Sequence, residues 1–262
     1  MAAHISMRQT QFSYFNQVLG QPAWKGSKIL DFGGNVGGFL TGSDDYVEHN
    51  DYWCLDVTQA AIEHGRSDFP RAHFVFYDRY SSYFNSKGIR KLPIPDLGLQ
   101  FNIILAFSVF THTHQNEMLD LLEQLGRQLL PGGVLAFTFA DPSYDRSVCN
   151  PSLRRGTGVI RQFSSHETRS PATGSAESQP RWCVEVDDVL YIEPGAELCQ
   201  QELLAKPAES YCSYFTADYM NSLFPEATVH LPVSPDWQHC CVLRKDDLLS
   251  RGDGKDKLRT RS

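Results

Sequence analysis

The segment from Ile29 to Leu40 constrains the fold of this chain more than any other. An apolar run over residues 29–32 meets the glycine-rich turn Gly33–Gly38, and further apolar residues follow the turn. Glycine suits a backbone that must adopt positive φ or let a ligand approach closely, and four glycines in six residues meet both needs. The segment therefore predicts a strand, a tight turn and the start of a helix, with a ligand lying against the turn.

The spacing of these glycines argues against a nicotinamide dinucleotide as the ligand. The dinucleotide fingerprint is Gly-x-Gly-x-x-Gly, and no placement of it fits, because Asn35 stands where a second spaced glycine is expected. Asp31, just ahead of the turn, would repel a pyrophosphate and suits a cationic ligand better. A nicotinamide oxidoreductase is therefore a disfavoured alternative, and it predicts NADH binding.

Composition narrows the class of protein. The chain has 262 residues, of which 41% are apolar, enough for a sizeable core in one large domain or in one domain with an insertion. A net charge of -7 gives no general attraction to nucleic acid or to anionic membranes. No apolar run reaches the roughly 18 residues of a membrane span, and residues 1–20 lack the apolar core of a signal peptide. We expect neither nucleic acid nor a membrane as partner.

The cysteines indicate a reducing compartment. There are seven, an odd number, with no Cys-x-x-Cys pair to begin a zinc site. Several lie in apolar runs, where cysteine acts as a small hydrophobe. We therefore expect reduced thiols, a cytoplasmic location and no metal centre.

Strands and helices alternate through the first half of the chain. Short apolar runs rich in aromatic and β-branched residues predict strands at 28–32, 51–57, 72–77, 101–107 and 134–139. The clearest helix is Gln115–Leu130, with Met118, Leu122 and Leu125 at helical spacing and Pro131-Gly132-Gly133 at its end. This alternation predicts an α/β fold with parallel strands, helices on both faces and a ligand at the carboxyl ends of the strands.

Acidic residues stand at three successive strand ends. Asp31 ends the first strand, Asp56 ends the second and Asp78 follows the third. One such residue is more often a helix cap or a solvated turn, but three in succession favour a ligand site. Asp56 lies about twenty residues beyond the glycine turn, where a carboxylate accepts hydrogen bonds from both ribose hydroxyls. Asp78 is placed to accept from an adenine amine.

These motifs together resemble the class I S-adenosylmethionine-dependent methyltransferases, of the bacterial small-molecule type. Residues 30–37 are similar to the first motif of that family, 55–57 to the acidic end of its second strand, and 76–79 to its third motif. Further similarities are those of residues 107–112 to the segment after the fourth strand, 129–135 to the turn before the fifth, and 237–244 to the last, antiparallel strand. The sequence departs from the family at Asn35, where glycine is usual.

The resemblance implies a Rossmann-like, doubly wound, mostly parallel seven-stranded sheet, with an antiparallel last strand and a lid inserted after the fifth strand. The implied division is a cofactor-binding core (1–141), an insertion or lid (142–210), a completion of the core sheet (211–245) and a disordered tail (246–262). Residues 181–193 of the insertion are predicted to form strands, and 216–224 the last helical segment. Candidate contacts to an anionic substrate are Arg154, Arg155, Arg161 and His166, although a solvated loop is the alternative.

The cofactor implied by the resemblance is S-adenosylmethionine. The main chain around Gly33 and the backbone near Ala106 and Phe107 would hold its methionine portion, and Asp31 would support the loop and the ammonium group. Asp56 would bind the ribose. The residues that the resemblance implies as cofactor-binding are Asp31, Gly33, Gly34, Asn35, Gly37, Asp56, Val57, Tyr77, Asp78, Ala106 and Phe107.

The implied reaction is methyl transfer to a small organic acceptor, with O- or N-methylation favoured. His112 is the candidate general base because it follows the fourth strand, with packing at the mouth of the pocket as its alternative. The remaining candidate substrate contacts are Tyr14, Phe15, His114 and Trp182, although residues 12–19 are as consistent with a helix packed on the sheet edge. The alternative function is a protein of this fold that transfers no methyl group and acts as a noncatalytic partner or a repurposed enzyme.

Overall fold

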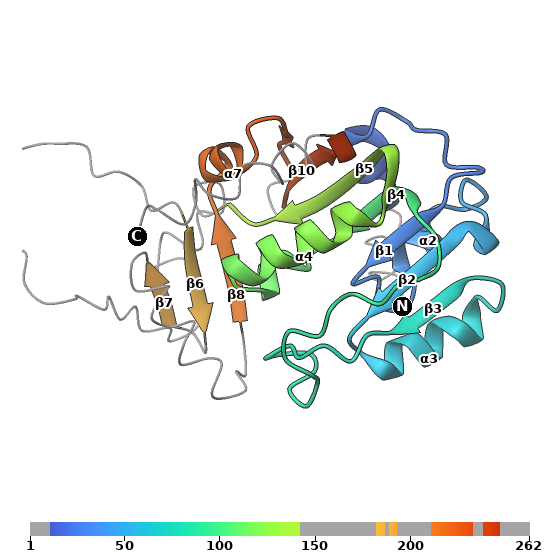
Figure 1. The fold of residues 1–262 in the computed structure, drawn as a ribbon, viewed down its shortest axis with the longest axis horizontal. Coiled ribbons are helices and arrows are strands. Elements are labelled where there is room, and N and C mark those ends of the chain that lie inside the picture. The colour runs from blue at the N-terminus through green and yellow to red at the C-terminus, as the bar shows by residue number, and fades with distance from the viewer. Residues whose placement is uncertain (1–10, 142–181, 187–188, 193–210, 233–237, 247–262) are drawn as a thin grey trace, which may run out of the picture.

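The computed structural model describes residues 11–141, 182–186, 189–192, 211–232 and 238–246. Within these residues the main sheet has seven strands in the order β3-β2-β1-β4-β5-β10-β9 (Figure 1). The strands are β1 (Ile29–Phe32), β2 (Tyr52–Asp56), β3 (His73–Phe76), β4 (Phe101–Ala106), β5 (Leu129–Phe139), β9 (Thr228–His230) and β10 (His239–Arg244). The strands β1 to β5 run parallel, and β10 is antiparallel to both of its neighbours. The predicted doubly wound sheet with an antiparallel last strand is confirmed.

The sheet is covered on both faces, because successive side chains of each strand enter opposite cores. On β1, Leu30 packs into the core that contains Met118 and Leu122 of α4 (Gln115–Arg127). Its neighbour Ile29 packs into the other core, with Ile62 of α3 (Gln59–Asp68). The helical residues 11–18 and α2 (Gly38–Gly42) contribute to this second core, and α7 (Ala217–Leu223) contributes to the first. This two-layer burial explains why the strands are apolar almost throughout.

The boundary between α4 and β5 differs from the sequence prediction. The helix ends at Arg127, and the strand starts at Leu129, so Pro131, Gly132 and Gly133 lie in the strand and do not terminate the helix. Leu129 pairs with Phe101 of β4, but the register shifts before the next pair. Gly132 has a φ of 74°, which indicates a local bulge that only glycine accommodates at little cost.

A second, smaller sheet is inserted in the chain between β5 and β9 of the main sheet. The strands β6 (Trp182–Val186), β7 (Val189–Ile192) and β8 (Tyr211–Phe215) are antiparallel, in the order β7-β6-β8. The strands predicted within 181–193 are therefore present. In contrast, residues 211–215 do not complete the core sheet as expected, because they pair with β6. They meet the core sheet at the end of β5, where Phe215 N donates to Ala140 O at 2.8 Å.

Several predictions concern parts of the chain outside the described residues. These are the loop 142–181 with its arginines and His166, and most of the tail, from residue 247 onward. Among the described residues, none of the helices has the length and apolar character needed to cross a bilayer.

Candidate active site

The carboxyl ends of the first four strands meet at one edge of the sheet. Phe32 at the end of β1 pairs with Leu55, and Asp56 at the end of β2 pairs with Phe76 at the end of β3. The connection after β1 is fastened to this edge, since Gly33 N donates to Leu55 O at 2.7 Å. The structure thus brings the glycine turn, Asp31, Asp56 and Asp78 to the same edge, as the topology predicts.

The structure explains Asn35. Its φ is 53°, in the left-handed region that asparagine tolerates better than most residues, so it takes the place of glycine in the turn. Its backbone N–H donates to Asp56 Oδ2 at 2.8 Å, and its side-chain Oδ1 accepts from Val36 N at 2.8 Å. Asn35 therefore ties the glycine turn to the acidic end of β2.

Two glycines of the turn are required by the protein's own packing. A Cβ on Gly34 would lie 2.5 Å from Asp31 Oδ2 and 2.9 Å from Cys54 Sγ. A Cβ on Gly33 would overlap the side chain of Val109, and the φ of 76° at this position also favours glycine. The glycines therefore let the turn sit directly on the buried Asp31 and on the segment that follows β4.

Asp56 is buried but keeps acceptor capacity. Its side chain accepts from Asn35 N on Oδ2 and from Thr58 N on Oδ1, at 2.8 and 2.7 Å. Burial raises the pKa of this carboxyl group, while these backbone donors lower it in part. Each carboxylate oxygen can accept a second hydrogen bond, so the group suits a ligand with two neighbouring hydroxyls.

Asp31 is the most strongly perturbed carboxyl group at this edge. It is only 4% exposed, and the hydroxyl of Tyr52 donates to its Oδ2 at 2.5 Å. Burial raises its pKa to about 7, the hydrogen bond from Tyr52 lowers it, and the charge of Asp56 raises it further. A ligand ammonium group nearby would favour the ionised form and reverse this shift.

The shift at Asp31 predicts a pH-dependent stability. Its folded pKa of about 7 lies above its ordinary value of 3.8, so between these pH values the folded protein holds a proton that the unfolded chain has released. Raising the pH therefore removes stability through this window, by roughly 2 kcal/mol between pH 5 and pH 8. We expect Asp31→Asn to match the wild type at pH 5 and to exceed its free energy of unfolding at pH 8.

Urea denaturation of both proteins at the two pH values measures this effect. The difference between variant and wild type cancels the other titrating groups, which the two proteins share. A difference that stays constant with pH would contradict a raised pKa at Asp31.

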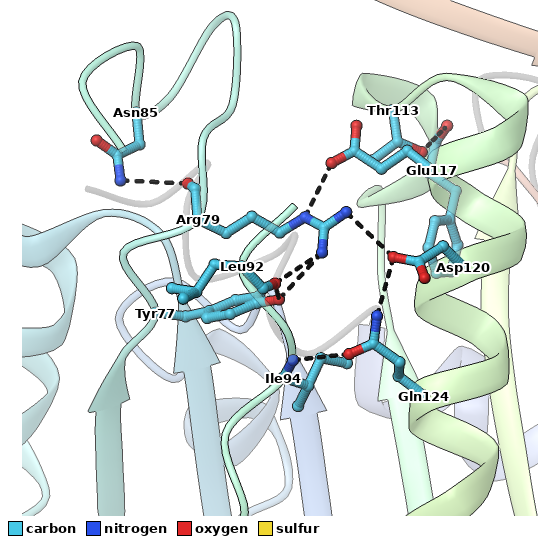
Figure 2. A network of polar contacts seen from close by, with 10 residues as sticks. Tyr77, Arg79, Asn85, Leu92, Ile94, Thr113, Glu117, Asp120 and Gln124 are labelled. Atoms are coloured by element: carbon cyan, nitrogen blue, oxygen red, sulfur yellow. Dashed lines mark hydrogen bonds and ion pairs between the residues drawn. The ribbon is translucent and has the colours of Figure 1, made fainter. Parts of the chain in front are cut away.

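The third acidic residue, Asp78, belongs to a loop that is anchored to α4. Asp78 Oδ1 accepts from Asn85 Nδ2 at 3.0 Å. The next residue, Arg79, is 4% exposed and points to the helix, where Nε donates to Glu117 at 3.0 Å and Nη2 to Asp120 at 3.3 Å (Figure 2). Its Nη1 also donates to Leu92 O at 2.8 Å, on the returning part of the loop.

Gln124 extends this network along α4. It donates to Asp120 and accepts from Ile94 N at 2.8 Å, so the helix holds the β3–β4 connection at several points (Figure 2). Partly buried, hydrogen-bonded ion pairs of this kind fix geometry more than they add stability. The loop that carries Asp78 is consequently held in one position relative to α4.

The segment after β4 contains a strained residue that the sequence did not reveal. Ser108 has a φ of 56°, which is unfavourable for serine. Three hydrogen bonds hold it there: Ser108 N donates to Thr138 Oγ1 at 2.7 Å, Thr138 donates to Gln238 at 2.6 Å, and Gln238 donates to Ser108 Oγ at 2.8 Å. The three residues of this ring are separated in sequence by 30, 100 and 130 positions. Ala106 and Phe107, predicted to hold the methionine portion, directly precede it.

His112 lies in the short helix η2 (Phe110–His112) and is held by β8. Its Nδ1 lies 2.9 Å from the carbonyl oxygen of Tyr211. Because a carbonyl only accepts, Nδ1 carries the proton, and Nε2 presents a lone pair. Burial lowers the pKa of His112, and the bond to Tyr211 raises it in part, so the ring is neutral at pH 7. The geometry therefore gives the candidate base the form that accepts a proton.

His114 takes the same tautomer by a longer chain of hydrogen bonds. Ser213 Oγ uses its single proton to donate to Thr113 O at 2.6 Å, so the Tyr211 hydroxyl must donate to Ser213 at 2.8 Å. Tyr211 then accepts from His114 Nδ1 at 2.9 Å. Burial lowers the pKa of His114 to about 4, which makes it the weaker base. His114 also starts α4, as expected, but it is partly buried and not at the open surface.

Four of the predicted contact residues are buried in the cores of the protein. Tyr14 and Phe15 are 2% and 1% exposed, and the Tyr14 hydroxyl donates to Gln238 O at 3.1 Å. Trp182 is 1% exposed and stacks on Phe215 of β8, with ring centroids 6.3 Å apart. Tyr77, predicted to frame adenine, is equally buried, and its hydroxyl donates to Leu92 O at 2.5 Å. Apolar aromatic residues at these positions fill the cores, which accounts for their pattern in the sequence.

The comparisons with known proteins agree with this architecture. Residues 30–135 match the sequence model of a family described as a methyltransferase domain. The structure is similar to that of S-adenosylmethionine-bound CalS10, an amino pentose methyltransferase from Micromonospora echinaspora, with a TM-score of 0.51 and 15% identity over 92% of this chain and 91% of that one.

Two further solved structures give comparable values. The glycopeptide N-methyltransferase MtfA, complexed with sinefungin, has a TM-score of 0.52 and 11% identity over 89% of this chain and 85% of that one. The PH0226 protein from Pyrococcus horikoshii OT3 has a TM-score of 0.53 and 17% identity over 90% of this chain and 89% of that one. At these sequence identities, the structural similarities show that the fold is shared.

Proposed function

We propose that the chain is a class I S-adenosylmethionine-dependent methyltransferase and that it transfers a methyl group from S-adenosylmethionine to a small organic acceptor. The match of residues 30–135 to the methyltransferase-domain model supports this proposal. The observation that carries the proposal is the joint position of Asp31, the glycine turn and Asp56 at one edge of the sheet. The proposed reaction is O- or N-methylation in biosynthetic metabolism. We further propose a cytoplasmic location, which the odd number of cysteines in the chain supports.

The chain's own residues have distinct proposed roles in binding the cofactor. Asp56 accepts hydrogen bonds from the two ribose hydroxyls, and the glycine turn with Ala106 and Phe107 surrounds the methionine portion. The side chain of Asp31 packs against the glycine turn, and its carboxylate compensates the charge of the cofactor's ammonium group. Asp78 and Val57 lie beside adenine. When bound, S-adenosylmethionine supplies a methyl group on a sulfonium, which needs little further activation.

Positioning then provides much of the rate, because the acceptor must approach the methyl group in line. The acceptor atom forms its bond to the methyl carbon as the carbon–sulfur bond breaks. The proton lost by the acceptor goes to His112 Nε2, whose lone pair is available because Nδ1 donates to Tyr211 O.

Calorimetry with S-adenosylhomocysteine and with NADH tests the proposal. We expect S-adenosylhomocysteine to bind at a single site with micromolar affinity and NADH to give no heat of binding. Binding of NADH alone would favour the oxidoreductase alternative. If neither S-adenosylhomocysteine nor S-adenosylmethionine bound, the alternative of a protein of this fold that transfers no methyl group would remain. The presence of all three acidic residues, Asp31, Asp56 and Asp78, disfavours that alternative.

A further inference from the structure

Two exposed aromatic side chains lie beside the candidate base. Tyr83 and Phe84, on the β3–β4 connection, are 50% and 46% exposed. The ring of Tyr83 is stacked against that of His112, with centroids 6.1 Å apart and an interplanar angle of 14°. The ring of Phe84 stands edge-on to both, 5.0 Å from His112 and 4.7 Å from Tyr83. We call Tyr83, Phe84 and the ring of His112 the aromatic shelf.

The aromatic shelf belongs to an ordered part of the loop. Asn85, the next residue, donates from its side chain to Asp78 and to Arg79 O, and its backbone pairs with Ser81 in both directions. Arg79 fixes this loop to α4 through its ion pairs, and Figure 2 shows Asn85 and Arg79 in this arrangement. A fixed loop that exposes two aromatic rings is typical of a contact surface, because such rings are otherwise buried.

The position of the shelf indicates what it contacts. His112 belongs to the shelf, and its Nε2 carries the lone pair because Nδ1 donates to Tyr211 O. A flat molecule lying against Tyr83 or Phe84 is therefore within reach of the nitrogen that accepts the proton. Aromatic rings prefer offset-stacked and edge-to-face contacts with other rings, and the perpendicular pair of Tyr83 and Phe84 offers one of each.

We propose that the aromatic shelf binds the acceptor and that the acceptor carries a planar aromatic ring with a hydroxyl group. The proposal rests on the proposed methyl transfer and adds to it the class of substrate. The phenolic proton passes to His112 Nε2 as the oxygen forms its bond to the methyl carbon, and the sulfur leaves as a neutral thioether.

The weak basicity of His112 independently favours an acidic hydroxyl. Burial lowers the pKa of this histidine from 6.5. A phenol has a pKa of about 10, whereas an aliphatic hydroxyl, like water, loses its proton only near about 15. The difference between the pKa of the hydroxyl group and that of His112 is smaller for a phenol than for an aliphatic alcohol. A phenol therefore gives up its proton to this base more readily.

A comparison of 2-naphthol with its saturated analogue, decahydro-2-naphthol, tests the shelf. Protein loaded with S-adenosylhomocysteine is titrated with 2-naphthol by fluorescence, and the saturated alcohol is measured by competition. We expect 2-naphthol to bind at least about tenfold more tightly. Tyr83→Ser and Phe84→Ser should each weaken its binding by roughly fivefold, because each removes one ring contact.

Tyr46→Ser is the matched control, since Tyr46 is 61% exposed and lies outside the loop. It should leave the affinity for 2-naphthol unchanged. Equal affinity for the two probes, or unchanged affinity in both shelf variants, would overturn the proposal and point to a macromolecular partner for the exposed rings. S-adenosylhomocysteine is titrated first with every variant. If S-adenosylhomocysteine failed to bind the wild type, the proposed function itself would be refuted. If it bound normally and the shelf variants had no effect on 2-naphthol, only the proposed role of the aromatic shelf would be refuted.

Discussion

Asp56→Ala is expected to weaken the binding of S-adenosylhomocysteine by about two orders of magnitude. Under the proposed function, the substitution removes two charge-assisted hydrogen bonds to the ribose hydroxyls, which together account for roughly 3 kcal/mol. The substitution also removes the acceptor for Asn35 N, which ties the glycine turn to β2. Calorimetry measures the affinity, and circular dichroism confirms that the variant is folded.

Asp56→Asn sharpens the interpretation of this result. The carboxylate accepts from backbone N–H groups on both oxygens, so the amide group of asparagine must face one of these donors with its own N–H. We therefore expect a loss nearly as large as that of the alanine variant. Asp68→Ala serves as the control, because Asp68 is a half-exposed carboxylate at the end of α3 and far along the chain from the glycine turn. An affinity within threefold of the wild type in Asp56→Ala would remove Asp56 from the binding site.

The strand ends that carry the site were predictable from the sequence because parallel strands are short, apolar and followed by polar residues. Asp31 and Asp56 mark such ends, and their alignment follows from the topology alone. In contrast, β9 has only three residues, none of them buried, so no pattern marks it. Short edge strands owe their pairing to the neighbouring strand and not to their own composition.

The parts of the site that depend on long-range pairing could not be predicted. Nothing local in residues 211–215 indicates that this strand pairs with β6, or that the Tyr211 carbonyl accepts a hydrogen bond from His112 Nδ1. Similarly, Ser108 is an ordinary residue in the sequence, and its strained backbone follows from partners at positions 138 and 238. The burial of aromatic residues such as Trp182 could not be predicted either, because an aromatic side chain serves a core and a binding site equally well.

His112→Ala is expected to lower kcat by a factor of about one hundred or more, with an unchanged affinity for S-adenosylhomocysteine. General-base catalysis contributes about 10²- to 10⁴-fold when the acceptor must lose its proton in the transition state. His112 makes no contact with Asp31, the glycine turn or Asp56 among the interactions described above, so the cofactor affinity should be independent of it. His64→Ala, at an exposed position of α3, is the matched control.

The pH profile distinguishes a base from a packing residue. The base must be neutral, and burial lowers the pKa of His112 below 6.5, so kcat should be level at neutral pH and fall only as the pH drops below that lowered value. Nitrogen-15 NMR of the imidazole groups should show a lone pair on Nε2 of His112, since Nδ1 donates to Tyr211 O. If kcat of His112→Ala stayed within threefold of the wild type at every pH, the ring would only support Tyr83 and Phe84, and the acceptor would lose its proton to water.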